Sequence, residues 1–147
     1  MAQQKRSGRL KPVARLAEEK QQRAARKLGE ILQRLQQQQQ QLQELESYRN
    51  EYICQLQDAA RNGIKATQLR HYQSFVSKLS EAIEQQQKVV LVAEQDVAIA
   101  RDNWFQTRNR VKMVDSVISS CQAEELQGEL RCEQKESDER AQRGSGR

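Results

Sequence analysis

The residues of this chain that could bind a metal ion or attack a substrate are one histidine, His71, and three cysteines, Cys54, Cys121 and Cys132. Zinc sites usually take their cysteines from close pairs such as Cys-x-x-Cys, and the sequence has no such pair. It also has no glycine-rich phosphate loop and no Gly-x-Ser-x-Gly motif. We therefore expect no enzyme, no metal and no cofactor.

The chain as a whole is too polar for an ordinary globular core. It has 147 residues, of which 31% are charged and 4% are aromatic, and its mean hydropathy is -0.98. Such a composition is typical of disordered chains or of long helices that bury a narrow apolar seam. The single proline favours helices, because helix interiors exclude proline whereas disordered segments are usually rich in it.

Localisation is predicted from the cysteines and the apolar runs. Three cysteines are too few for a disulfide framework, so we expect a reducing cytoplasm. The first residues, "MAQQKRSGRL", lack the apolar core of a secretory signal, and the longest apolar run, from Val89 to Ala93, is far too short to span a membrane.

Apolar residues recur at heptad spacing in two long ladders, which is the pattern of a coiled coil. The first comprises Leu28, Ile31, Leu35, Gln38, Leu42, Leu45, Arg49, Tyr52, Leu56 and Ala59, and extends weakly back to Ala14. The second comprises Leu69, Tyr72, Val76, Leu79, Ile83, Gln86, Val90, Ala93, Val97, Ala100, Trp104, Thr107, Val111, Val114, Ile118 and Cys121, and fails at Glu125.

Between the ladders, Asn62-Gly63 suits a helix C-cap and Thr67 suits an N-cap. The sequence therefore predicts an all-α fold, in which two long helices form an antiparallel coiled-coil hairpin. We expect a flexible basic N-terminus at 1–12 and a coiled coil over 13–140, followed by a flexible C-terminus at 141–147. Within the coiled coil, the helices are expected at about 13–61 and 67–136, with a turn at 62–66.

The ladders also predict a register. If Ala59 lies opposite Leu69, then Tyr52 lies opposite Val76, and Gln21 forms a polar layer with Thr107. The second helix is expected to outrun the first beyond Val114. The glutamine run at 36–41 could be prion-like, but the intact ladder around it favours a solvated helix face.

Four of the chain's aromatic residues lie on either side of the turn: Tyr48, Tyr52, Tyr72 and Phe75. Tyr52 and Tyr72 fall at seam positions, whereas Tyr48 and Phe75 fall on one flank with Ala82 and Val89. This flank could support the seam by packing, or it could be a docking surface for a partner. The sequence favours neither alternative.

Charge is unevenly distributed along the chain. Bases predominate between Lys5 and Glu30 and acids between Glu124 and Arg140, which suggests docking of the two ends to each other or to a partner. The basic segment followed by leucines at seven-residue spacing is also typical of a DNA-binding leucine zipper. Glu18-Glu19 interrupts the basic run, and the second ladder supplies a partner within the chain, so we expect no nucleic-acid ligand and keep the zipper as the alternative.

Around the turn, the chain resembles the FliJ family of flagellar type III export proteins. The resemblance rests on "LQELESYRNEYICQL", the glycine of "RNGI", "LRHYQSFVSKLSEAIEQQ", Trp104 and "KESDERAQR", and covers about residues 13 to 143. It implies a two-helix antiparallel coiled coil similar to the central stalk of rotary ATP synthases. The stalk protein of a virulence secretion system is the alternative within the same class.

The resemblance also implies a function and a set of partners. The protein would be a non-enzymatic stalk and adaptor whose terminal end enters the ring of the export ATPase FliI, with contacts to FliH, substrate chaperones and the export gate protein FlhA, and so would lie at the cytoplasmic face of the inner membrane. The positions that match the family's gate contacts are Leu45, Tyr48, Tyr52, Phe75, Leu79 and Ala82. The basic residues expected at the ATPase ring are Arg15, Arg23, Arg26 and Lys27.

Overall fold

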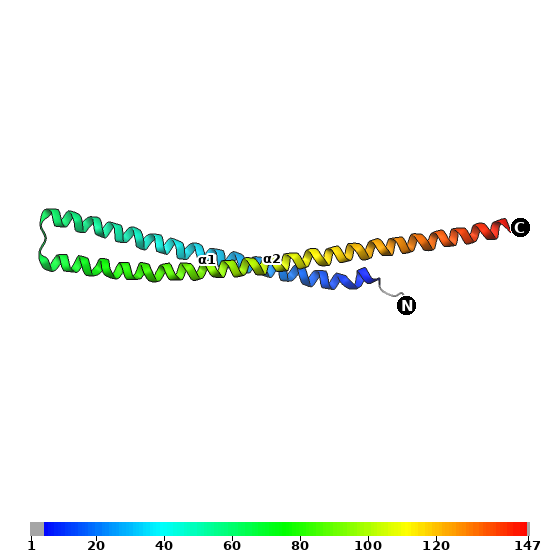
Figure 1. The fold of residues 1–147 in the computed structure, drawn as a ribbon, viewed down its shortest axis with the longest axis horizontal. Helices are drawn as coiled ribbons and strands as arrows, with labels where there is room; N and C mark the ends of the chain where they lie inside the picture. Colours follow the sequence, from blue (N-terminus) through cyan, green and yellow to red (C-terminus); the bar gives the residue numbers. More distant parts are fainter. Residues whose placement is uncertain (1–4, 147) are drawn as a thin grey trace. The chain divides into compact units, whose positions relative to one another are not determined.

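A computed structural model describes residues 5–146, which form two helices and no strand (Figure 1). Helix α1 spans Arg6–Asn62 and helix α2 spans Ala66–Ser145. The chain divides into two compact units. We call Ala25–Asn103 the hairpin unit, and Met1–Ala24 together with Trp104–Arg147 the terminal unit. The predicted all-α fold of two packed helices is confirmed.

The hairpin unit contains the connection between the helices, at residues 63–65 (Figure 1). Gly63 has a φ of 78° and its N–H donates to the carbonyl of Ala60, so it ends α1 in the left-handed conformation that glycine adopts without penalty. At the start of α2, the N–H of Leu69 donates to the carbonyl of Lys65. Lys65 therefore precedes the first helical turn, and Thr67, the expected N-cap, lies inside the helix.

The seam lies where the heptads place it. The buried apolar residues of the hairpin unit are Leu79, Ile83, Val90, Ala93, Val97 and Ala100, and those of the terminal unit are Ala17, Ala24 and Cys121. All of them occupy ladder positions. Their counterparts on α1 in the hairpin unit, such as Leu28, Leu35 and Leu42, are half-buried, as expected where only two helices share a seam.

The polar layer of the hairpin unit joins the two glutamines that interrupt the ladders. The side-chain amide of Gln86 donates to the side-chain oxygen of Gln38 at 2.7 Å and to its backbone carbonyl at 3.1 Å. The predicted layer of Gln21 with Thr107 lies in the terminal unit, where the Thr107 hydroxyl donates to the Trp104 carbonyl of its own helix, and it stays a prediction. A polar pair inside an apolar seam favours one alignment of the helices, because any other alignment leaves an amide unpaired.

In the hairpin unit, some long side chains of α1 contact α2 one helical turn closer to the start of α2 than the expected register places them. Tyr52 was expected opposite Val76, but its ring contacts Tyr72 at 5.8 Å and Phe75 at 4.4 Å between centroids. In the same way, Gln38 meets Gln86 rather than lying level with Val90. Amide–amide and ring–ring contacts thus determine which side chains meet along the seam.

The helices extend further toward the chain ends than the sequence predicts. Helix α1 begins at Arg6 rather than near residue 13 and contains Pro12, and α2 continues to Ser145 rather than ending near 136. In the terminal unit, α2 outruns its partner later than the expected Val114, because Ser7 contacts Glu125 and Lys5 pairs with Glu129, while α2 continues to Ser145. Residues 1–4 and 147 of the expected flexible ends lie outside the described residues.

The Gln38–Gln86 layer can be tested by a double-mutant cycle. Leucine at both positions replaces a bonded polar pair by apolar groups and should leave the free energy of unfolding unchanged or raise it. Each single leucine leaves one amide facing an apolar side chain. We therefore expect the losses in unfolding free energy of the two single variants to add up to at least about 0.5 kcal/mol more than the loss in the double variant. Urea unfolding followed by circular dichroism measures this difference, and additive effects would show that the two amides are not coupled.

Candidate partner-binding surfaces

The aromatic residues of the hairpin unit form one cluster across the two helices. Tyr52 contacts Phe75 and Tyr72 as described above, and Tyr48 lies 5.6 Å from Tyr52 and 6.1 Å from Phe75, the latter edge to face. Centroid separations of about 4.5–7 Å are those at which aromatic rings attract one another beyond simple burial. The two seam tyrosines and the two flank aromatics predicted from the heptads therefore form a single layer of rings.

The members of this cluster differ in their exposure. Tyr48 is 47% exposed, whereas Tyr52, Tyr72 and Phe75 are half-buried. Tyr48 can therefore offer one ring face to a partner while its other contacts hold it in place. A ring that is already fixed loses little conformational entropy on binding, which is one reason why tyrosine is enriched at interfaces.

The structure divides the residues expected at the export gate into accessible and inaccessible ones. Leu79 is buried in the seam, and Leu45 and Ala82 are half-buried. Val89, which the heptads place on the same flank as Ala82, is 44% exposed. Tyr48 is therefore the exposed member of the set, Tyr52 and Phe75 are half-buried like Leu45 and Ala82, and Leu79 can act only by supporting the surface from within.

The basic residues expected at the ATPase ring belong to two different compact units. Arg15 and Arg23 belong to the terminal unit, and Arg26 and Lys27 belong to the hairpin unit; all four are exposed. Each pair therefore has to be considered by itself. Both pairs have the exposure that contact with an acidic partner surface requires.

The terminal unit has a further polar site, where Glu125 of α2 caps the start of α1 at Ser7. The carboxylate of Glu125 accepts a hydrogen bond from the Ser7 backbone N–H at 3.0 Å and another from the Ser7 hydroxyl at 2.8 Å. Lys5 forms an ion pair with Glu129, one turn further along α2. The first N–H groups of a helix have no partner within the helix, so a carboxylate from α2 supplies the missing acceptor.

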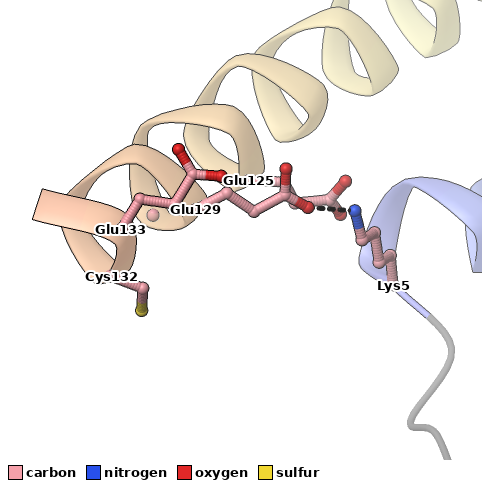
Figure 2. A pocket seen from close by; sticks show the side chains of 6 residues that line it. Lys5, Glu125, Glu129, Cys132 and Glu133 are labelled. Atoms are coloured by element: carbon pink, nitrogen blue, oxygen red, sulfur yellow. Dashed lines mark hydrogen bonds and ion pairs between the residues drawn. The ribbon is translucent and has the colours of Figure 1, made fainter. Parts of the chain in front are cut away.

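The electrostatics of this site follow from its hydrogen bonds. The backbone N–H of Ser7, and then its hydroxyl, lower the pKa of Glu125 below its ordinary value of 4.5. The hydrogen bond to Glu129 and its negative charge raise the pKa of Lys5 above 10.5. Glu133 and Cys132 line the same open depression (Figure 2).

The uneven charge predicted docking of the two ends to each other or to a partner, but it did not identify Glu125 as the anchor. Glu125 was taken as the point at which the second ladder fails, whereas the structure makes it a half-buried member of the seam opposite buried Ser7. The available signal was its heptad position, because a polar residue at a seam position needs a polar partner on the other helix. Ser7 continues the first ladder backwards from Ala14 in the same spacing.

Trp104 forms a smaller aromatic site in the terminal unit. Its ring lies 5.9 Å from that of Phe105, edge to face, and the Arg108 guanidinium lies 5.4 Å from the Trp104 centroid. Arg108 follows Trp104 by one helical turn, so the cation lies over the ring face within the distance of a cation–π contact. Phe105 is 55% exposed.

The residues considered first for chemistry remain separate. Cys54 and Cys132 are exposed and Cys121 is buried, all with free thiols, and His71 is exposed. Across residues 5–146, no group of histidine, cysteine, aspartate or glutamate is arranged to hold a metal ion. No helix in that range is long and apolar enough to cross a membrane.

Comparison with known proteins gives one consistent result. The model of the family described as "Flagellar FliJ protein" matches residues 5–147. The chain is 35% identical to the flagellar FliJ protein of Salmonella typhi and 34% identical to that of Escherichia coli (strain K12), in each case over 140 residues that cover 95% of both chains. No solved structure matches.

The cap of α1 by Glu125 makes stability depend on pH in a defined direction. Because folding lowers the pKa of Glu125, its contribution is present above pH 4.5 and is lost as pH falls through the folded-state pKa. We expect Glu125→Gln to lower the melting temperature at neutral pH, and the difference from the wild type to disappear when the measurement is repeated at an acidic pH below the folded-state pKa of Glu125. Thermal unfolding followed by circular dichroism measures this.

Glu124→Gln is the matched control, since it removes the same charge from the neighbouring, exposed position. It should leave the melting temperature within error of the wild type at both pH values. If the two variants behave alike, the effect comes from net charge and not from the cap. Ser7→Ala, which keeps the backbone donor and loses the hydroxyl, should fall between the wild type and Glu125→Gln.

Proposed function

The chain belongs to the flagellar FliJ family, and on that premise we propose that it is a non-enzymatic stalk and adaptor of the flagellar type III export apparatus. In this role it links the export ATPase FliI to the export gate protein FlhA, with FliH and substrate chaperones as further partners, at the cytoplasmic face of the inner membrane. The observation that carries the proposal is the partly exposed aromatic cluster of the hairpin unit, which has the features of a protein-binding surface.

The gate-binding surface is centred on Tyr48. Tyr48 is the most exposed ring of the cluster and is held by Tyr52 and Phe75 at 5.6 and 6.1 Å. Protein interfaces concentrate their binding energy in a few aromatic residues that are preorganised and partly buried before binding. The family resemblance at this position and the geometry of the cluster therefore point to the same residue.

The ATPase-binding surface is assigned to the basic residues of α1. Arg15 and Arg23 in the terminal unit, and Arg26 and Lys27 in the hairpin unit, are exposed. Positive side chains near the ends of a coiled coil would attract acidic groups that line a ring. Binding through these residues should accelerate association and should weaken as salt is added.

The arrangement of the seam speaks against the leucine-zipper alternative. In a zipper, the leucines at 28, 35 and 42 would have to face a second chain. Here these positions are half-buried, while seam residues of α2 such as Val90 and Val97 are buried in the same unit. The apolar ladder of α1 therefore already packs against α2 of the same chain.

Replacement of Tyr48 by Ala tests the gate-binding surface. Because Tyr48 is nearly half exposed, the substitution should change the free energy of unfolding by less than about 1 kcal/mol. Binding to the purified cytoplasmic domain of FlhA, measured by calorimetry, should weaken by about tenfold or more, as for an aromatic hot spot. Swimming on soft agar should fall in parallel.

Leu32→Ala is the matched control, an exposed apolar truncation on the same helix in the same unit. It should leave gate binding unchanged. Phe75→Ala removes the ring that packs 4.4 Å from Tyr52 and should cost stability as well as binding. Unchanged gate binding by Tyr48→Ala would overturn the assignment and return the cluster to a purely structural role.

Charge reversal tests the ATPase-binding surface one pair at a time. Arg15→Glu with Arg23→Glu, and separately Arg26→Glu with Lys27→Glu, should each lower stimulation of FliI ATP hydrolysis severalfold, with the larger loss at low salt. Arg70→Glu with Lys78→Glu, exposed on α2, is the control for net charge. If all three double variants lose stimulation equally, the effect is not specific to α1; if none does, the assignment is wrong.

A further inference from the structure

Helix α2 of the hairpin unit is apolar on two sides. Its seam side is buried, as Val90 and Val97 show. Its outward side carries a second set of apolar residues, with Leu91 at 57%, Val92 at 55% and Ile99 at 69% exposure. A helix that shares its seam with one partner normally has a polar outer face, so an exposed apolar stripe marks a surface used for binding.

The stripe has helical spacing and defined ends. Its members are Lys88, Leu91, Val92, Gln95, Ala98, Ile99 and Asp102, all exposed. Residues three, four and seven apart lie on one face of a helix, so these side chains form a continuous strip. Gln95 lies at the middle of the strip, and the strip begins with a positive and ends with a negative side chain.

Two copies of this strip are complementary to each other when they pack antiparallel. If a second strip is laid antiparallel on the first with Gln95 opposite Gln95, Leu91 of each copy lies level with Ile99 of the other. In the same pairing, Val92 lies level with Ala98. The strip thus pairs two large apolar side chains with each other and, in the next layer, places Val92 against the small Ala98, which lets the two helices approach closely.

The charges select the same pairing. Laid antiparallel, Lys88 of each copy meets Asp102 of the other, which gives two attractive pairs at the two ends. Laid parallel, Lys88 would meet Lys88 and Asp102 would meet Asp102, which is repulsive at both ends. At the centre, two Gln95 amides can bond to each other, because an amide side chain is both donor and acceptor.

We propose that residues 88–102 of α2 form a self-association surface, on which a second copy of the chain packs antiparallel about a two-fold axis at Gln95. A two-fold interface must present the same patch on both subunits. Each residue of the patch must therefore be complementary in size and charge to the residue that the two-fold axis places opposite it. The strip meets this requirement in its apolar residues, its charges and its centre. The partner of this surface is therefore a second copy of this chain, and the two hairpin units together form a four-helix arrangement.

The self-association surface is separate from the surfaces assigned under the proposed function. Leu91, Val92 and Ile99 lie on the outward face of α2, whereas Tyr48 belongs to the aromatic cluster near the turn and the basic residues belong to α1. Self-association can be measured on the purified full-length chain alone. A chain that does not self-associate could still bind the gate and the ATPase. A chain that binds neither of them could still self-associate.

The first experiment measures the oligomeric state of the full chain by sedimentation velocity over a wide range of concentration. The wild type should pass from monomer to dimer as concentration rises. Leu91→Glu should raise the dimer dissociation constant by at least about tenfold, since it places a charge in the apolar strip. Glu81→Gln, which alters an exposed charge of the same helix outside the strip, should not. A wild type that stays monomeric, or a dimer indifferent to Leu91→Glu, would overturn the proposal.

The second experiment tests the pairing by exchange of charges. Lys88→Asp alone places like charges together at both ends and should weaken the dimer, and Asp102→Lys alone should do the same. The double variant, Lys88→Asp with Asp102→Lys, restores opposite pairs and should recover the wild-type dissociation constant. Binding to a different protein, or non-specific adhesion of apolar surface, predicts no such recovery, so failure of the double variant contradicts the antiparallel pairing.

The third experiment locates the two-fold axis by disulfide cross-linking in a chain whose own cysteines are replaced (Cys54→Ser, Cys121→Ala, Cys132→Ser). Gln95→Cys lies on the axis and should cross-link to its copy under mild oxidation. Lys88→Cys lies on the same strip, but antiparallel pairing separates the two copies of this position by roughly 20 Å, beyond the reach of a disulfide. Equal cross-linking at both positions would indicate a parallel pair or random collisions, and either result rejects the proposal.

Circular dichroism decides whether any of these variants acts by unfolding. All of the substituted strip positions are exposed, so helicity and melting temperature at low concentration should match those of the wild type. The recovery of self-association in the double charge variant provides a second safeguard. A chain that had lost its fold could not regain a specific dimer through one further charge.

Discussion

The burial of a seam one heptad ladder wide is the interaction on which the rest of this structure depends. The chain has a mean hydropathy of -0.98, and the buried apolar residues of both units all lie at ladder positions. Neither helix can remove its ladder from water alone, so the two helices are stable only when packed on each other. Each unit therefore consists of helix paired with helix, and no separate core exists within residues 5–146.

In a narrow seam, two interruptions that meet have a large influence on alignment. In the hairpin unit, the interruptions at Gln38 and Gln86 meet and bond to each other. In the terminal unit, Ser7 and Glu125 do the same at the start of α1. A ladder of similar apolar residues tolerates sliding, whereas a hydrogen-bonded pair is satisfied in one alignment only. These two polar pairs thus contribute alignment, and the apolar positions contribute most of the stability.

The seam also decides which side chains remain available to partners. Leu79 points into it and is buried, whereas Tyr48 lies beside it and keeps about half of its surface. The outward strip from Lys88 to Asp102 lies on the opposite face of α2 and contributes nothing to the seam. A two-helix pair has a large surface for its length, so different faces of the same helices can serve different partners without sharing residues. The gate-binding, ATPase-binding and self-association surfaces proposed above use three such faces.

The sequence by itself determined the two helices, the turn at Gly63 and the residues of the seam, because heptad spacing and the φ requirement of a turn are local properties. It also placed Tyr48 and Phe75 on one flank. Only the tertiary structure decided which interruptions meet: Gln86 bonds to Gln38, and Glu125 caps α1 at Ser7, so α2 has a partner beyond Val114. These contacts join residues far apart in the chain, and their choice depends on the reach and hydrogen-bonding capacity of side chains across the seam. Spacing along one helix carries no information about that choice.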